Sequence, residues 1–90
     1  MTEADTPELT VYGTAWCPDV ARTRRFLDRH EIPYAYKDID FDPEALAFIT
    51  EANGGDWIVP TIALSDGTLL FNPSLQELNR LLVRPRRANK

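Results

Sequence analysis

The sequence predicts one α/β domain, in which helices cover both faces of a mixed four-stranded sheet. The chain has 90 residues, which is enough for one compact domain and not for two. Its first half alternates between strand and helix patterns, and a strand–helix–strand start requires a parallel pair joined by a right-handed crossover. A short turn, Ser65-Asp66-Gly67, then joins two further strands and adds an antiparallel pair before a last helix.

The first strand and the first helix occupy residues 9–12 and 18–30. Residues 9–12 alternate apolar and polar side chains in a β-prone run that Gly13 closes. In the helix, the spacing places four side chains on one face, namely Val20, Thr23, Phe26 and Leu27. Pro33 cannot continue a helix and restrains its predecessor, so the helix ends before it.

A second strand at residues 34–39 and a second helix at residues 43–52 follow. Asp42 is a suitable N-cap, Pro43 suits the first helical position, and Gly54 permits a left-handed cap at the end. We expect the buried side of this helix to consist of Ala45, Leu46, Ile49 and Ala52.

The last three elements are strands at residues 58–64 and 68–71 and a helix that begins after Asn72-Pro73-Ser74. We expect this helix to bury Leu75, Leu78, Leu81 and Leu82. The resulting order is βαβαββα, in a single domain over residues 1–90 with an ordered core at about 9–83.

The charge pattern argues against nucleic-acid and membrane partners. The last seven residues carry four positive charges, and the other 83 carry six positive and 14 negative side chains, a charge of −8. An acidic body repels nucleic acid, and no apolar run is long enough to span a membrane. The acidic N-terminal tail lacks the basic start and apolar stretch of a signal peptide. We therefore expect a cytoplasmic protein with a basic C-terminal tail.

The only cysteine, Cys17, is the candidate reactive group. A single cysteine excludes an intramolecular disulfide and the usual four-ligand zinc site, so we expect no metal. Cys17 lies between the first strand and the first helical turn, where unpaired backbone N–H groups and the helix dipole favour a thiolate. Trp16 and Pro18 flank it, and the carboxylate of Asp19 opposes a second negative charge nearby.

Two motifs on this framework resemble those of glutaredoxins, which have a thioredoxin-like fold. Trp16-Cys17-Pro18-Asp19-Val20 follows the first strand, and Val59-Pro60-Thr61 follows roughly forty residues later. Asn53-Gly54-Gly55 and Asn72-Pro73-Ser74 look most like the mycoredoxins of actinobacteria. The resemblance covers residues 9–83.

The resemblance implies a role for Cys17 and Pro60. Cys17 matches the nucleophilic cysteine that attacks a mixed disulfide between a client protein and a low-molecular-weight thiol. Pro60 matches the family's cis-proline beside that cysteine, which leaves the backbone of Val59 free to pair with the bound thiol. The expected thiol-binding residues are Trp16, Pro18, Asp19, Val20, Trp57, Ile58, Val59 and Pro60.

Departures from the family pattern restrict the chemistry. Val20 replaces the second cysteine of the dithiol motif, which leaves a monothiol route in which a second small-thiol molecule releases the first. Thr14 stands where many glutathione-using members carry a basic residue, and Ile58 replaces the usual threonine. These changes weaken the case for glutathione and suit mycothiol or another sugar thiol. For Val20 a place in the core, and for Trp57 a half-buried core position, are the alternative interpretations.

Three functions follow, and the first is preferred. In the preferred interpretation, we expect a monomeric monothiol oxidoreductase that acts on small thiols and thiolated client proteins. Alternatively, two chains share an iron–sulfur cluster through two Cys17 thiolates and two small thiols. The third interpretation is a non-catalytic interaction module that keeps only the shape of the fold.

Overall fold

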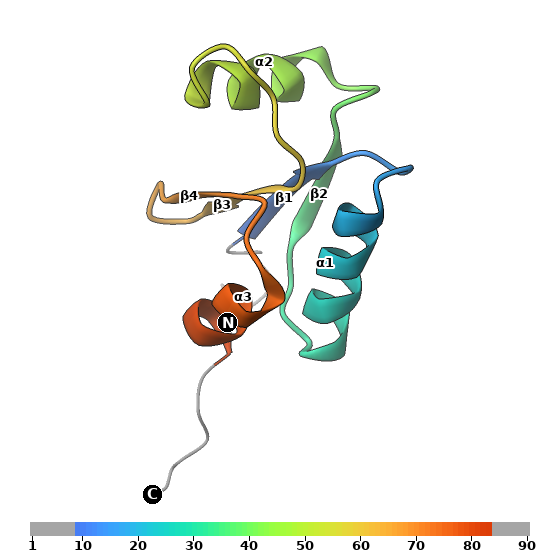
Figure 1. The fold of residues 1–90 in the computed structure, drawn as a ribbon, viewed down its shortest axis with the longest axis vertical. Coiled ribbons are helices and arrows are strands. Elements are labelled where there is room, and N and C mark those ends of the chain that lie inside the picture. The colour runs from blue at the N-terminus through green and yellow to red at the C-terminus, as the bar shows by residue number, and fades with distance from the viewer. Residues whose placement is uncertain (1–8, 84–90) are drawn as a thin grey trace, which may run out of the picture.

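The computed structural model describes residues 9–83, and it has the predicted element order (Figure 1). The acidic and basic tails predicted at the two ends lie outside these residues. The strands and helices are β1 (Leu9–Gly13), α1 (Pro18–Arg29), β2 (Ala35–Asp38), α2 (Pro43–Ala52), β3 (Thr61–Leu64), β4 (Leu69–Phe71) and α3 (Leu75–Leu82). Over this part of the chain, no helix combines the length and apolar character that a membrane crossing requires.

The four strands form one mixed sheet in the order β2-β1-β3-β4. β1 pairs with β2 in parallel, as the crossover through α1 requires. On its other side β1 pairs with β3 antiparallel, with Val11 opposite Ile62, and β3 pairs with β4 through the predicted hairpin. The predicted sheet is therefore confirmed.

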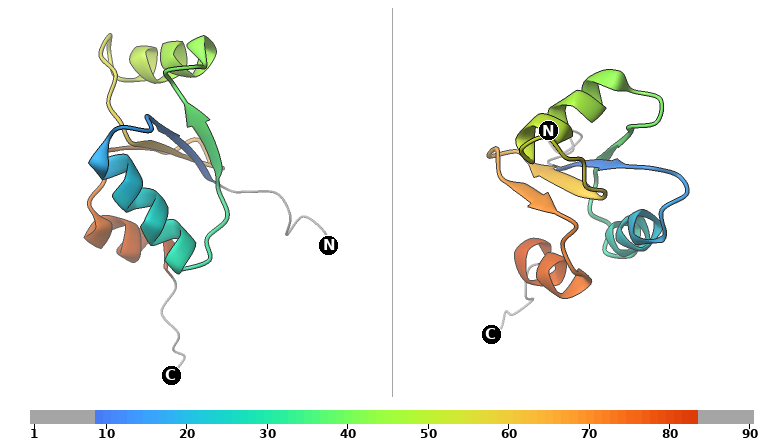
Figure 2. Two further views of the ribbon diagram at one scale, coloured as in Figure 1. Left: turned by 90° about the vertical axis from the view of Figure 1, so that its right-hand side faces the viewer. Right: turned by 45° about the horizontal axis from the view of Figure 1, so that its top comes forward.

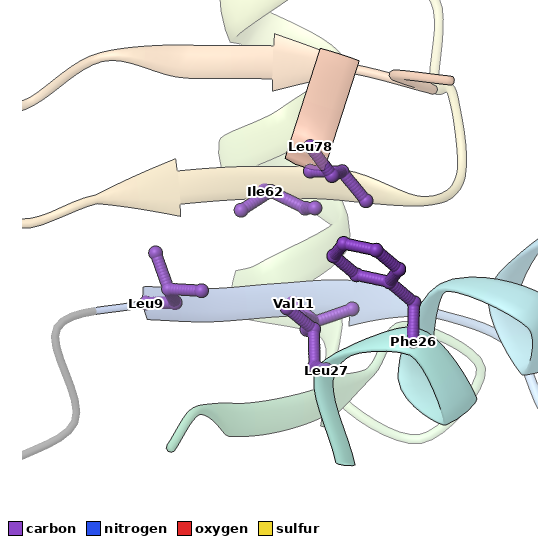
Figure 3. Close-up of a cluster of buried hydrophobic side chains, with 6 residues drawn as sticks. All are labelled: Leu9, Val11, Phe26, Leu27, Ile62 and Leu78. Carbon is purple, nitrogen blue, oxygen red and sulfur yellow. The ribbon is translucent and has the colours of Figure 1, made fainter. Parts of the chain in front are cut away.

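Helices cover both faces of this sheet, α1 and α3 on one face and α2 on the other (Figures 1 and 2). Side chains of β1 alternate between the two faces. The larger buried cluster lies on the α1 and α3 side and comprises Leu9, Val11, Phe26, Leu27, Ile62 and Leu78 (Figure 3). The smaller buried cluster lies on the α2 side and comprises Tyr12, Ile39, Ala45 and Ile49.

The predicted face of α1 is buried as expected, whereas those of α2 and α3 are narrower than predicted. Val20, Thr23, Phe26 and Leu27 are all buried. In α2 only Ala45 and Ile49 are buried, whereas Leu46 is 36% exposed and Ala52 is exposed. In α3 Leu78 is buried and Leu81 is 47% exposed. Each of these short helices rests on the sheet along a narrow line of positions. Leu46, about 100° around the helix from Ala45, therefore reaches solvent, as do Ala52 and Leu81, which lie about 60° from Ile49 and Leu78.

The third strand begins at Thr61 and not at residue 58 as predicted. The Val59–Pro60 peptide bond is cis, and proline has no N–H to offer a neighbouring strand. Residues 59 and 60 form a bend that leads into β3. The caps of α2 agree with the sequence: Asp42 accepts a hydrogen bond from the Ala45 N–H at 3.1 Å, and Gly54 has φ +74°.

Candidate active site around Cys17

Cys17 is the N-cap residue of α1. Its backbone is extended, its carbonyl accepts the N–H of Ala21 at 3.1 Å, and its own N–H points to the Thr14 carbonyl at 3.5 Å. The thiol makes no capping hydrogen bond, and the residue is partly exposed as a free cysteine. The sulfur therefore lies at the electropositive end of the helix and is within reach of solvent.

Pro18 and Asp19 form the first turn after the thiol. Pro18 is the first residue of α1, the position where its missing N–H costs no helical hydrogen bond. Asp19 pairs with Arg22, with 2.6 Å between Oδ1 and Nη1 and both side chains about half exposed. A pair this exposed adds little stability, but it places a positive charge beside the carboxylate of Asp19, two residues after Cys17.

The cis-proline reaches the same end of the sheet as Cys17. Tyr12 of β1 lies opposite Thr61 of β3, so the residues after β1 and the residues before β3 meet at one edge. Pro60 is buried there, and its carbonyl accepts the N–H of Asn72 at 2.7 Å. The expected cis bond is thus present, and it is tied to the segment that precedes α3.

A cavity of about 310 Å³ lies between the first turns of α1 and residues 72–75. Asp19, Arg22 and Thr23 line one wall, and Asn72 with its neighbours lines the other. The α3 helix begins at this wall, where the Ser74 hydroxyl accepts the Glu77 N–H at 3.0 Å. The helix-start motif Asn72-Pro73-Ser74 was visible in the sequence, but the cavity beside it was not.

Trp16 lies on the other flank of Cys17, towards β2. Its indole is 64% exposed, and its Nε1–H donates a 2.9 Å hydrogen bond to Oδ2 of Asp40. Asp40 was not among the predicted site residues, because nothing in a sequence links two positions 24 apart. The parallel pairing of β1 and β2 brings the loops that follow these strands to one end of the sheet (Figure 1).

The remaining predicted residues divide between the surface and the core. Trp57 is 45% exposed, and Val59 is partly buried against the cluster on the α2 side. Ile58 is partly buried, and its carbonyl accepts the Thr61 hydroxyl at 2.6 Å. Val20 is only 2% exposed, so its side chain fills the core, as the alternative interpretation holds.

Two further observations concern polar side chains, one near Cys17 and one over the described residues as a whole. The Thr14 hydroxyl is buried and has no hydrogen-bond partner within the described part of the chain. Residues 9–83 also contain no group of three or more His, Cys, Asp or Glu side chains arranged to hold a metal ion. Cys17, the single cysteine of the sequence, is the candidate reactive group of this site.

Fold and site together define a thioredoxin-like domain with one thiol at a helix N-terminus and a cis-proline at the same sheet edge. The sequence matches the glutaredoxin family over residues 9–69. The chain belongs to the glutaredoxin family.

Its curated relatives come from actinobacteria. The chain is 38% identical over 79 residues to "Putative glutaredoxin Rv3198A" of Mycobacterium tuberculosis, covering 88% of this chain and 94% of that protein. It is 40% identical over 70 residues to Mycoredoxin 1 of Corynebacterium glutamicum, covering 78% and 86%. The resemblance to glutaredoxins and mycoredoxins is therefore confirmed, and the chain is a glutaredoxin-like thiol oxidoreductase.

Solved structures show the same fold. A glutaredoxin from Archaeoglobus fulgidus superimposes with a TM-score of 0.69 at 24% identity, covering 90% of this chain and 91% of that one. The thioredoxin-like protein BC3987 superimposes with a TM-score of 0.73 at 23% identity, covering 82% and 99%. These identities are low, so the two structures support the fold alone.

Proposed function

We propose that the protein is a monothiol, mycoredoxin-like oxidoreductase that removes a low-molecular-weight thiol from protein mixed disulfides through Cys17. The observation that carries the proposal is the position of Cys17: partly exposed, at the N-terminus of α1, with the cis-proline at the same sheet edge. A thiolate is the nucleophile in disulfide exchange, and a helix N-terminus stabilises an anion.

The reaction balances as two exchanges. In the first, the Cys17 thiolate attacks the small-thiol sulfur of the mixed disulfide, a new disulfide forms on Cys17, and the client leaves as a thiolate. In the second, a free small-thiol molecule attacks that disulfide, Cys17 is released as a thiolate, and the two small thiols leave as their own disulfide. The second molecule is needed because Val20, buried in the core, replaces a resolving cysteine.

The cavity beside α3 supports a polar small thiol as co-substrate. Its lining includes the Asp19–Arg22 pair and Asn72, polar residues that suit hydroxyl and amide groups. Thr14, in the place of the family's basic residue, is only 1% exposed and offers no charge to a glutathione carboxylate. Mycothiol, a sugar thiol, fits this pattern better than glutathione does.

The proposal also includes a cellular compartment, the cytoplasm, and an oligomeric state, the monomer. Reductive exchange requires a pool of reduced small thiol, which the cytoplasm provides. One chain contains every residue that the two exchanges use, so a monomer suffices. The co-substrate is the small thiol, and the clients are proteins that carry it.

Intact-mass analysis tests the proposal directly. The protein is incubated separately with the disulfides of mycothiol, glutathione and bacillithiol, and the mass of the adduct on Cys17 is measured. We expect the mycothiol adduct to form fastest, to be removed by reduced mycothiol, and to be absent from Cys17→Ser.

A peptide that carries a mixed disulfide then provides the turnover assay. We expect the wild type to release the free peptide and Cys17→Ser to release none. If the wild type forms no adduct and releases no peptide with any of the three thiols, the proposal is wrong, and the interaction-module interpretation is favoured.

A further inference from the structure

Asp40 is the residue of this site whose purpose the proposed function leaves unexplained. It is exposed, it lies outside both sequence motifs, and its carboxylate accepts the indole N–H of Trp16 at 2.9 Å. Trp16 precedes the reactive cysteine directly in the chain. The question is what this hydrogen bond does for Cys17.

The loop that carries Asp40 is itself held in place by the backbone. The Asp40 N–H donates to Oδ1 of Asp38 at 2.9 Å, and the Phe41 N–H donates to the Asp38 carbonyl at 3.0 Å. The Ile39 N–H donates to the carbonyl of Gly13, the last residue of β1, at 3.0 Å. These bonds hold the backbone that carries Asp40 against the strand that leads to Cys17.

Trp16 is largely exposed, and among residues 9–83 its indole makes one hydrogen bond, to Asp40. Trp16 is 64% exposed and makes no aromatic stacking contact within residues 9–83. A largely exposed side chain can adopt several rotamers, and a hydrogen bond to a charged acceptor favours one of them. A ring already fixed in its bound orientation loses less entropy when a ligand contacts it.

We propose that Asp40 is a positioning residue that holds the Trp16 indole as a fixed aromatic wall beside Cys17, where it contacts the incoming mixed disulfide. The wall stands on the β2 flank of Cys17, whereas Pro60 and the cavity beside α3 stand on the β3 flank. A disulfide that reaches the thiol between the two flanks has the indole on one side. This inference rests on the proposed function, because the ligand is the substrate of that reaction.

The first test examines the hydrogen bond without any substrate. The indole N–H resonances of the ¹⁵N-labelled protein are recorded, and Trp57→Phe assigns them. We expect Asp40→Ala to shift the Trp16 indole resonance and to speed the exchange of its N–H proton with water. Asp40→Asn keeps an acceptor oxygen, so its chemical shift and exchange rate should lie close to those of the wild type. An unchanged resonance in Asp40→Ala would overturn the inference.

The second test measures binding without turnover. A peptide with a single cysteine in mixed disulfide with mycothiol, or in a parallel arm with glutathione, is titrated into Cys17→Ser. We expect the Trp16 resonance to move with saturation, and Asp40→Ala in this background to raise the half-saturation concentration about three- to tenfold. A Trp16 resonance that does not move at saturation, or an unchanged half-saturation concentration in Asp40→Ala, would contradict the proposal that Asp40 holds Trp16 against the substrate.

The third test uses turnover to separate positioning from charge. We expect Asp40→Ala to raise KM about three- to tenfold at unchanged kcat, Trp16→Phe to do the same, and the double variant to equal either single variant. Asp28→Ala, which removes one negative charge near the far end of α1, should leave KM unchanged. If Asp40→Ala raises KM equally in the Trp16→Phe background, the inference is wrong. A wild type without turnover would contradict the proposed function, while the first two tests still decide this inference.

Discussion

Gly13 and Val20 are in close contact, and this contact joins the end of β1 to the first turn of α1. A Cβ atom placed on Gly13 would lie 2.7 Å from Cγ1 of Val20 and 2.9 Å from Cγ2, closer than real Cβ atoms approach. Since Val20 is 2% exposed, it cannot move outward without opening the core. The glycine thus allows the strand to approach the helix that carries Cys17.

Substitution of Gly13 by alanine should destabilise the fold by about 1–3 kcal/mol, because overpacking a rigid site displaces its neighbours. Urea unfolding measures the change. Val20→Ala alone should also cost about 2 kcal/mol through the cavity it leaves. The double variant should lose less stability than the two single losses added together, because the cavity accepts the added methyl group. Strict additivity would contradict the contact.

Replacement of Val20 by cysteine should restore an internal route for release of the small thiol. Positions 17 and 20 are three apart at the start of a helix, so their side chains lie on one side of it. We expect the adduct on Cys17 to persist in the wild type after free thiol is removed. In Val20→Cys the adduct should be lost, leaving a protein two hydrogens lighter by mass spectrometry. Val20→Ser is the control, because serine is close to cysteine in volume and has no thiol, and this variant should keep the adduct.

Two buried threonines should respond oppositely to replacement by valine. The Thr14 hydroxyl has no hydrogen-bond partner within residues 9–83, so Thr14→Val should leave the free energy of unfolding unchanged or raise it by up to about 1 kcal/mol. The Thr61 hydroxyl donates to the Ile58 carbonyl at 2.6 Å, and its loss should cost about 1 kcal/mol. Chemical denaturation compares the two. Equal losses would mean that the Thr14 hydroxyl has a partner in solution.

Tyr36 should make stability depend on pH in the alkaline range. Burial, and then the charge of Asp38, raise the pKa of Tyr36 above its ordinary value. The folded state therefore retains this proton after the unfolded chain has lost it. The contribution is complete below the unfolded-state pKa of about 10 and is lost as the pH rises through the folded-state pKa.

Tyr36→Phe tests this dependence. The Tyr36 hydroxyl is buried without a hydrogen-bond partner in the described region, and the Arg24 guanidinium lies 3.9 Å from the ring centroid. Phenylalanine keeps that ring, so stability at pH 7 should be unchanged or slightly higher. As the pH rises above the unfolded-state value of about 10, the variant should lose less stability than the wild type in urea titrations. Parallel losses would exclude Tyr36 as the titrating group.

The sequence predicted those parts of the fold that depend on neighbouring residues. The buried face of α1, the Asp42 cap and the hairpin after β3 follow from spacing and turn chemistry within a few positions. The exposure of Leu46 and Leu81 did not, because the width of a buried helical face depends on the sheet beneath it. Periodicity also placed the start of the third strand too early, at residue 58, because the apolar pattern continues through Pro60, which has no N–H to pair with a neighbouring strand.

The positions of Cys17 and Pro60 in the candidate site were predictable, whereas the surroundings of Cys17 were not. Cys17 and Pro60 stand in recognisable motifs, and the structure brings them to one sheet edge. Asp40 has no motif, and it meets Trp16 only because two parallel strands end together. The cavity between α1 and α3 likewise arises from packing between segments about fifty residues apart.

The burial of Val20 has a consequence for how long an intermediate lasts. Under the proposed function, the mixed disulfide on Cys17 has no internal cysteine to reduce it, because Val20 occupies that position. Its release therefore requires a free thiol from solution. Turnover then rises and falls with the reduced fraction of the cell's thiol pool. Until that release the sulfur is held as a reversible disulfide, which protects it from peroxide and from irreversible oxidation.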